Sequence, residues 1–468
     1  MVRAPSHTAH CAIHRNEGHV VGRSHEHTWR VTDRTIPQPS NHGRSAGVSS
    51  HSTPAAVRQT ERTTIALLSG VYIIDFIDRV MIAVALPLIG AEFGLPRTTQ
   101  GLIVSAFAIA YTIGQLPGGL LADRVGARPL LVISLIAWSV FTAATGFAPG
   151  LLILLLLRML FGIAQALFPA ASFKALAERT TREARSRSAG LILSSNYLGA
   201  GLGPLIVAPL VVAAGWRHTF WIIAAGGLII GVVLWRLLPP PLSRDLTEQG
   251  DHPAPAVGGR VPMSRVLRNG LVVRCAVMFG CFNMLVYGMI TWVPSYLVVA
   301  KGMSLVKAGV SAAVPQLISA IAVVIGGWLM SRRFDQRPRV LVVPALVIAA
   351  ALLVPMLLAT STTMFTVLQT LAMFSSALAT IGIIGLPLRV LPRDVVGSGF
   401  GVVNTGGQLA GVLAPLVMGW LADQFGFAAA FGFLAATTLA AALISLTTRP
   451  RNAEQGVSAT TTAMEGVR

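Results

Sequence analysis

The chain has 468 residues, of which 54% are hydrophobic and only 12% are charged, and its mean hydropathy is +0.69. This composition is too apolar for a soluble protein of this length and predicts an integral membrane protein. A formal net charge of +18 would suit a nucleic-acid partner. However, the arginines fall in short segments between apolar runs and in the tails, so we expect no nucleic-acid binding.

Metal, redox and enzymatic functions find no support in the residues. The cysteines Cys11, Cys275 and Cys281 have no metal-ligand spacing and do not form an even set for disulfides. No Walker, kinase or hydrolase motif occurs in its required context. We therefore expect no cofactor, no metal site and no enzyme activity.

Residues 1–62 are polar and contain eight of the ten histidines. They show no apolar periodicity and no continuous hydrophobic core of a signal peptide, which predicts a disordered cytoplasmic tail. Two other interpretations stay open. In one, His25 and His27 are metal ligands, although no regular ligand spacing supports them. In the other, the assigned start lies upstream of the true beginning.

From Thr64 onward, apolar runs recur, each of about 20 residues and long enough to cross about 30 Å of hydrocarbon. The predicted helices are 64–89, 98–122, 129–147, 150–177, 188–213, 219–238, 271–299, 307–331, 339–359, 362–390, 398–422 and 426–448. The fold class is therefore an all-α membrane protein with twelve transmembrane helices, and an even number of crossings places both termini on one side.

The arginines predict which side that is. Loops 178–187 and 332–339 and the segment 239–270 carry four arginines each, whereas loops 148–149 and 360–361 carry none. Arginine-rich short loops stay in the cytoplasm. We therefore expect a multi-pass inner-membrane protein with both termini in the cytoplasm.

The Pro- and Gly-rich segment 239–270 divides the helices into 63–238 and 271–448, and 449–468 forms a second disordered cytoplasmic tail. Two sequence motifs occur once on each side of this segment. The sequence GLLADR (119–124) returns as GWLMSR (327–332) at an offset of 208, and LGAGLGPL (198–205) returns as LAGVLAPL (409–416) at an offset of 211. The repeats predict two six-helix bundles related by a pseudo-twofold axis, with a substrate site at their interface.

Charged residues interrupt the first and fourth predicted helices. Asp75, Asp78 and Arg79 are spaced to share one face of the first helix, and Arg158 and Gln165 share a face of the fourth. Charged side chains in the middle of a membrane-spanning helix are costly and are retained mainly for function. These residues therefore predict a polar cavity at the midplane of the bilayer. The alternative is an ion pair that only locks the two helices together.

A glycine-rich motif, GGLLADRVGAR (118–128), connects the second and third predicted helices. Its glycines allow a tight turn, and its aspartate can accept hydrogen bonds from a neighbouring arginine or a helix N-terminus, so the motif is a candidate latch for the cytoplasmic face. The gating residues that we predict are Gly119, Asp123, Arg124, Gly126 and Arg128. The motif resembles the signature loop of the major facilitator superfamily, which implies the major facilitator fold.

Further motifs resemble the anion:cation symporter family over residues 64–445. They are Asp78-Arg79, Arg158 with Gly162 and Pro169, Gly215-Trp216-Arg217, and TWVPSYL (291–297). The resemblance implies proton-coupled transport of a small organic anion, a sugar acid or a similar carboxylate. It assigns substrate binding to Arg79 and Arg158, a proton site to Asp78, and a lining role to Tyr111 and Asn404.

The chain departs from that family at two places. Gln165 stands where the family usually has Glu, and Asp75-Phe76 stand where it usually has Asn-Tyr. Because an amide cannot titrate, we predict that Asp75 and Asp78 together carry the proton and that Gln165 only contacts substrate. The expected partners are the organic anion, protons and the lipid bilayer, and the chain is expected to be a monomer. The alternatives are an exporter or antiporter, an uncoupled facilitator of another small molecule, and a non-transporting receptor.

Overall fold

The computed structural model describes residues 54–243, 247, 263–334, 337–391 and 396–448. The chain divides into two units, Met1–His51 and Ser52–Arg468. The first unit lies outside the described residues, together with most of the predicted 1–62 tail, the predicted 449–468 tail and much of the 239–270 linker. All the described residues belong to the second unit.

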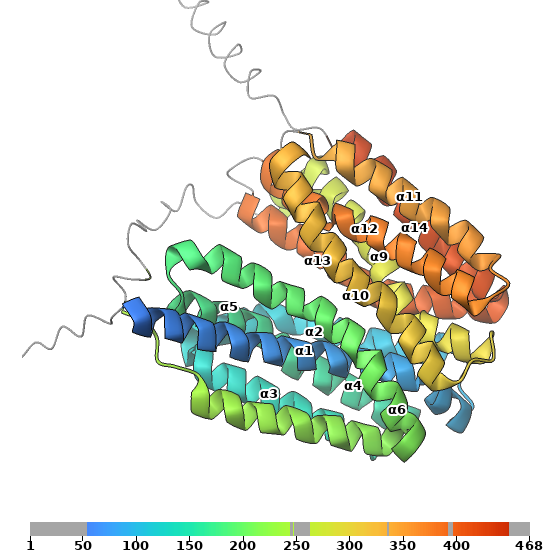
Figure 1. Ribbon diagram of the computed structural model, residues 1–468, viewed down its shortest axis with the longest axis horizontal. Coiled ribbons are helices and arrows are strands. Elements are labelled where there is room, and N and C mark those ends of the chain that lie inside the picture. Colours follow the sequence, from blue (N-terminus) through green and yellow to red (C-terminus); the bar gives the residue numbers. More distant parts are fainter. Residues whose placement is uncertain (1–53, 244–246, 248–262, 335–336, 392–395, 449–468) are drawn as a thin grey trace, which may run out of the picture. The chain divides into compact units, whose positions relative to one another are not determined.

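The described residues form helices and short turns, with no strand among them. The elements are α1 (Pro54–Glu92), α2 (Arg97–Val125), α3 (Ala127–Thr145), α4 (Leu151–Ala166), α5 (Phe168–Arg179), α6 (Arg182–Leu237), α8 (Met263–Leu267), α9 (Gly270–Val299), α10 (Leu305–Leu329), the π-helix η1 (Met330–Phe334), α11 (Arg339–Leu357), α12 (Thr362–Val390), α13 (Val396–Gln424) and α14 (Phe427–Thr447). Figure 1 shows their arrangement. The predicted all-α membrane fold is confirmed.

Within the described ranges, nine helical stretches are long and apolar enough to cross a membrane, or ten if the two parts of α2, bent by 49°, form one span. Two features explain the difference from the twelve predicted helices. The 56-residue α6 contains two of them, and α1 carries three charged side chains in its middle. Each of the twelve predicted ranges overlaps a helix of the structure.

The element α6 consists of two helices joined at a kink, and the chain reverses direction at Gly215. This glycine has φ 80° and ψ 162°, a backbone conformation outside the helical region that glycine adopts at little cost. A straight helix of this length would span about 84 Å, roughly twice the bilayer. The turn, which is visible in Figure 1, therefore separates the predicted helices 188–213 and 219–238.

The helix α1 begins earlier than the sequence predicted. It starts at Pro54, so residues 54–62, which we expected to belong to a disordered tail, are helical. Proline suits the first turn, and the residues that follow are mostly good helix formers. The extension is anchored, because the Glu61 carboxylate accepts hydrogen bonds from the backbone N–H and the hydroxyl of Thr181 at 2.8 Å each.

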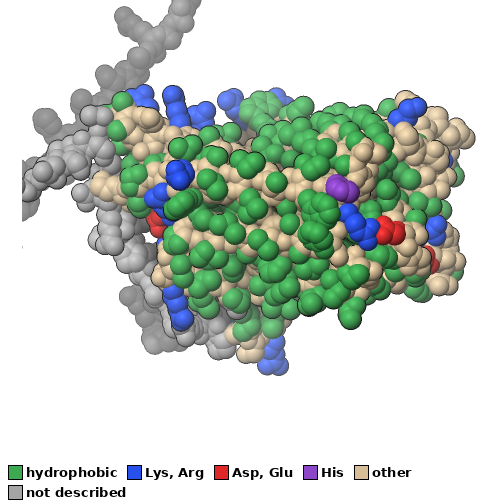
Figure 2. Space-filling model, turned by 90° about the horizontal axis from the view of Figure 1, so that it is seen from below, with side chains coloured by type: hydrophobic (Ala, Val, Ile, Leu, Met, Phe, Trp, Pro, Cys, Tyr) green, Lys and Arg blue, Asp and Glu red, His purple; other side chains and the backbone are tan. Residues whose placement is uncertain are grey.

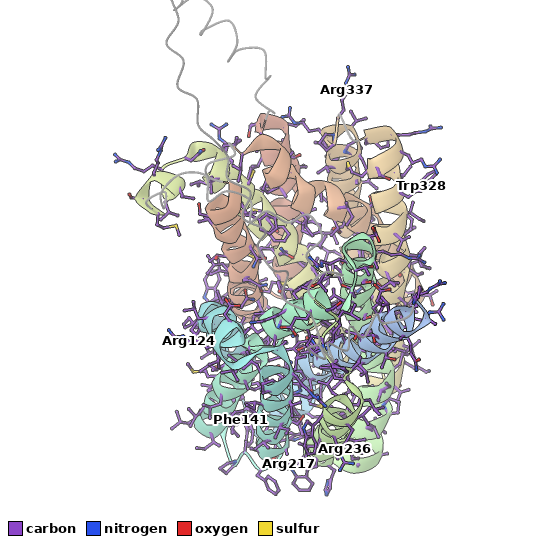
Figure 3. The ribbon with its side chains drawn as sticks, turned by 90° about the vertical axis from the view of Figure 1, so that its left-hand side faces the viewer. Arg124, Phe141, Arg217, Arg236, Trp328 and Arg337 are labelled. Atoms are coloured by element: carbon purple, nitrogen blue, oxygen red, sulfur yellow. The ribbon has the colours of Figure 1, made fainter. Side chains whose placement is uncertain are left out.

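The helices from α1 to α6 and those from α9 to α14 form two groups, which Figure 3 shows end on. Between the groups, α2 packs against α13, α6 against α10, and α1 against α9. Small residues allow this close approach, since a Cβ atom at Gly101 would overlap the Pro415 carbonyl and one at Gly309 would overlap Ala208. Hydrophobic side chains cover most of the face drawn in Figure 2, as expected for a surface that contacts lipid.

Candidate functional site

A cavity of about 60 Å³ lies where the two helix groups meet. Five helices contribute to it: α1, α2 and α4 from the first group, and α9 and α13 from the second. The lining residues are Phe76, Arg79, Val80, Ile82, Ala83, Val104, Phe107, Ala108, Arg158, Phe161, Tyr287, Ile290, Thr291 and Gly411. Both arginines that the sequence singled out therefore face the same space.

Arg79 is held from several directions. Its Nε donates a hydrogen bond to the Gln165 side-chain oxygen at 2.8 Å and lies 3.2 Å from an oxygen of Asp75, one helical turn away. The guanidinium carbon lies 4.4 Å from the ring centre of Tyr111, 5.0 Å from that of Phe76 and 5.5 Å from that of Phe107. Because Nε is occupied, the outer nitrogens of the guanidinium are what Arg79 can offer to an anion.

Arg158 is 1% exposed and less completely satisfied. One of its outer nitrogens donates to the Thr145 hydroxyl at 3.2 Å, and its cation lies 4.6 Å from the ring centre of Phe161 and 5.5 Å from that of Phe220. Its Nε has no hydrogen-bond partner among the described residues. A buried charged donor without a partner is costly, so Arg158 is suited to bind an anion that enters the cavity.

The two aspartates of α1 are also buried. Within the described part of the chain, neither carboxylate accepts a hydrogen bond of good geometry, although Asp78 lies beside the indole N–H of Trp138. Asp75 pairs with Arg79 along the same helix, while Asp78 interacts electrostatically with Arg158 across to α4. The Asp75 ion pair thus lies within α1. The contacts that join α1 to α4 are the Gln165 hydrogen bonds with Arg79 and with the Asp75 backbone oxygen, and the attraction between Asp78 and Arg158.

The remaining predicted substrate residues divide into two sets. Gln165 contacts Arg79 and also donates a hydrogen bond to the Asp75 backbone oxygen at 3.5 Å, and Tyr111 stacks on Arg79. Asn404, in α13, is neither among the residues that line the cavity nor among those that contact the two arginines. The structure therefore brings Tyr111 and Gln165 to the site but leaves Asn404 outside it.

The predicted gating loop forms the turn between α2 and α3. Gly126 has φ 92° and breaks the helix there, while a Cβ atom at Gly119 would meet nothing within 4 Å. The Asp123 side chain is 80% exposed and pairs at 3.4 Å with Lys174 of α5, in its own helix group. Arg128 donates to the Trp235 carbonyl. Figure 3 views the unit from this end, which we call the Asp123 end, with Arg124 labelled.

At the opposite end, which we call the Glu92 end, the two helix groups are joined. Asp423 near the end of α13 accepts hydrogen bonds from the backbone N–H groups of Arg97 and Thr98, at 3.0 and 2.7 Å, and from the Thr98 hydroxyl at 2.7 Å. Pro96 precedes α2 and supplies no side-chain cap, so Asp423 caps α2 from the other group. In the same half of α2, the Ser105 hydroxyl donates to the Val412 carbonyl at 2.6 Å.

Several of these residues were not predicted from the sequence. Asp423 lies in GWLADQFG (419–426), which matches GLLADRVG (119–126) at five of eight positions, and Gly426 has a positive φ as Gly126 does. This third copy of the glycine-rich motif could have been found in the sequence, and it would have indicated a role for Asp423. Glu92, which binds the Trp216 indole N–H at 2.6 Å and the Arg217 guanidinium, and Tyr287 of the cavity gave no comparable signal.

Comparisons with known proteins agree with this architecture. The family model of the Major Facilitator Superfamily matches residues 68–415 and, in a second match, 333–464. A probable sulfoacetate transporter of Cupriavidus necator, SauU, is 30% identical over 386 residues, covering 79% of this chain and 89% of that protein. The D-galactonate transporter of Escherichia coli O6:H1 is 29% identical over 405 residues, covering 81% and 93%.

Two further relatives extend the comparison. The hexuronate transporter of Bacillus subtilis is 28% identical over 374 residues, covering 77% of this chain and 87% of that protein. A crystal structure of a bacterial homologue of the human lysosomal transporter Spinster, inward-facing and occupied, has a TM-score of 0.67 at 18% identity, covering 82% and 94%. At that identity the structural likeness establishes the fold alone. The chain belongs to the major facilitator superfamily, a family of membrane transporters and not of enzymes.

Proposed function

We propose that this transporter moves a small organic anion, a sugar acid or a similar carboxylate, by proton symport with alternating access. The observation that carries the proposal is that Arg79 and Arg158 line one cavity, and that Arg158 is buried with an unpartnered donor among the described residues. Two guanidinium groups in a mostly apolar cavity bind a carboxylate far more strongly than they would in water. The names of the relatives, transporters of sulfoacetate, galactonate and hexuronate, support an organic acid as substrate.

The roles of the residues follow from their contacts. Arg79 and Arg158 bind the carboxylate, Tyr111 and Gln165 orient Arg79, and Asp75 and Asp78 carry the proton. An anion that reaches Arg79 competes with Asp75 for it, and a proton on Asp75 releases the arginine for the anion. Binding of the anion and binding of the proton therefore favour each other, which is the linkage that symport requires.

Gln165 favours a second candidate, an uncoupled facilitator or exchanger. Its amide cannot carry a proton, and it occupies the Arg79 Nε that a carboxylate would otherwise contact. An exporter or antiporter of a cationic compound is less compatible with the site, because the two arginines would repel such a substrate.

We further propose that the bundles 63–238 and 271–448 rock against each other, with the Asp123 end and both termini in the cytoplasm. This orientation follows the arginine-rich loops and predicts that the exposed position 183 faces the cytoplasm. A cysteine there, in a chain with its three native cysteines replaced by serine, should react with a membrane-impermeant maleimide only after the inner membrane is opened. Labelling in intact cells would reject the orientation.

The test of function is uptake by the purified protein in liposomes of a panel of labelled sugar acids, dicarboxylates and aromatic acids, with the internal pH recorded. The proposal predicts saturable uptake of at least one carboxylate, accompanied by acidification of the interior and absent from protein-free liposomes. Uptake without acidification would favour the facilitator. If no anion in the panel is transported above the protein-free level, organic-anion transport itself is refuted.

A further inference from the structure

The side chains that line the cavity indicate which kind of carboxylate fits between the two arginines. Apart from Arg79 and Arg158, only Tyr287 and Thr291 among the lining residues have a polar side chain. The rest are aromatic, aliphatic or glycine, and they come from both helix groups. A substrate bound between the arginines therefore meets hydrocarbon on most sides.

The polar side chains at the cavity are few, and some are already engaged. The Tyr287 hydroxyl lies 3.2 Å from the side-chain oxygen of Gln408 and donates its hydrogen to it, which leaves the hydroxyl only as an acceptor. Thr291 adds one further hydroxyl. The Nε of Arg79 is taken by Gln165. The cavity therefore offers a ligand the free guanidinium nitrogens of Arg79 and Arg158, but very few hydrogen-bond partners for neutral hydroxyl groups.

A polyhydroxylated acid needs more hydrogen-bond partners than this cavity offers. A six-carbon aldonate carries a hydroxyl on each carbon beyond the carboxylate, and each one that loses water without gaining a partner lowers affinity by about tenfold. An aromatic or aliphatic body gains instead from contact with Phe76, Phe107, Phe161 and Ile290, which lie around the same space. Aromatic side chains that flank the two arginines can stack on a flat ring as well.

We propose that the cavity selects a carboxylate with a compact apolar body, aromatic or aliphatic, over a polyhydroxylated sugar acid of the same charge. This inference rests on the proposed function, because it assumes that Arg79 and Arg158 bind the carboxylate. Phe76 is one specificity-determining residue: it lies on the cavity wall, and a hydroxyl added to its ring would give the wall a polar group. Its ring also lies 5.0 Å from the Arg79 cation, beside the position of a bound carboxylate.

Equilibrium binding to the full-length detergent-solubilised protein tests the inference. Binding is preferable to uptake here, because neutral forms of apolar acids cross bilayers unaided. Two sets of monocarboxylates are compared by the rise they cause in thermal stability: benzoate, phenylacetate and cyclohexanecarboxylate in one, and gluconate, galactonate and glucuronate in the other. We expect the best apolar acid to bind at least about tenfold more tightly than the best hydroxylated one.

Two variants sharpen the comparison. Phe76→Tyr should reduce the preference by about tenfold or more, whereas Phe425→Tyr, the same change at a position 67% exposed, should leave it unchanged. Arg158→Lys should weaken both sets.

The outcomes separate the inference from the proposed function. If hydroxylated acids bind as tightly as apolar ones and Arg158→Lys weakens them, the apolar selectivity is refuted while anion binding by the arginines stands. If no acid of either set binds, or if Arg158→Lys changes nothing, the premise that the two arginines bind a monocarboxylate is refuted and the inference fails with it, whereas the proposed function is decided by the uptake panel.

Discussion

Arg79 and Arg158 face the same cavity but are satisfied to different degrees. Arg79 has an ion pair, a hydrogen bond and three flanking rings, whereas the Arg158 Nε has no hydrogen-bond partner within the described ranges. An arginine that already has partners is positioned before the ligand arrives, and one that lacks them gains most when the ligand arrives. Arg158 should therefore contribute more to the binding of the anion.

Arg158→Lys tests this difference. Lysine keeps the charge but loses the planar fork that binds a carboxylate through two nitrogens. Loss of one charge-assisted hydrogen bond, about 1.5–3 kcal/mol, should weaken uptake at least tenfold. The matched control is Arg179→Lys, at a buried arginine that binds the Pro239 carbonyl and lies away from the cavity. Unchanged uptake kinetics in Arg158→Lys would remove this residue from the substrate site.

At the level of residues, the sequence predicted what helix geometry determines. Spacings of three and four place Asp75 beside Arg79, as the 3.2 Å ion pair illustrates. Arg79 lies about ten residues before the end of the predicted helix 64–89 and Arg158 about eight after the start of 150–177, which places both at a similar depth. The sequence could not predict that Thr145 contacts Arg158 or that Tyr287 lines the cavity. These contacts depend on how helices rotate and pack, which no spacing within a single helix encodes.

At the level of elements, the two copies of the glycine-rich motif that contain Leu-Ala-Asp, 121–123 and 421–423, have different contacts. Asp423 joins the helix groups at the Glu92 end, while Asp123 pairs only with Lys174 of its own group among the described residues. The cap thus holds the two groups together at the Glu92 end in this conformation, and we expect Asp123 to engage the other group when the Asp123 end closes. The two aspartates are expected to stabilise opposite states of the transport cycle.

Asp423→Ala should open the Glu92 end. Loss of a helix cap costs about 1 kcal/mol, which shifts the balance between two conformations roughly fivefold. Ser295 is buried and lines the cleft beside Asp423, so a cysteine placed there should react several-fold faster with an impermeant maleimide in the variant. Asp123→Ala, the same change in the other copy, should not increase the reaction. Equal labelling rates in Asp423→Ala and the parent would show that the cap does not hold this end closed.

Asp123→Asn should leave folding intact, because the side chain is 80% exposed, but should loosen closure of the Asp123 end. Turnover should then fall more than substrate affinity, since closure is a step of the cycle and not a substrate contact. Initial-rate uptake over a range of substrate concentrations measures both quantities, with Glu183→Gln at an exposed carboxylate as the control. A loss of affinity at undiminished turnover would mean that the loop is not a gate.

The sequence predicted the position of most elements because hydropathy marks the part of a helix that lies in lipid. It did not predict the start of α1 at Pro54 or the π-helix after α10, because helices extend beyond the membrane wherever local propensity and anchoring contacts allow it. The Glu61 contact with Thr181 joins residues far apart in the sequence, and no local pattern indicates it.

For the whole molecule, the central question is how proton binding is linked to anion binding. Gln165 and Asp75 both contact the Nε of Arg79, so a carboxylate at either position would act on the same guanidinium. This geometry supports the expectation that Asp75 has taken over a role that a glutamate at position 165 would serve. It also explains why the two substitutions should compensate each other.

Concentrative uptake under an imposed pH gradient, alkaline inside, tests this linkage most directly. Liposomes containing the parent chain, Asp75→Asn, or Asp75→Asn with Gln165→Glu are supplied with the best-transported carboxylate among those that protein-free liposomes do not take up, while internal pH is followed. The parent chain should raise the concentration of the anion inside the liposomes above the concentration outside. Asp75→Asn should not, and adding Gln165→Glu should restore part of the accumulation. If Asp75→Asn accumulates the anion as well as the parent chain does, Asp75 does not carry the coupled proton.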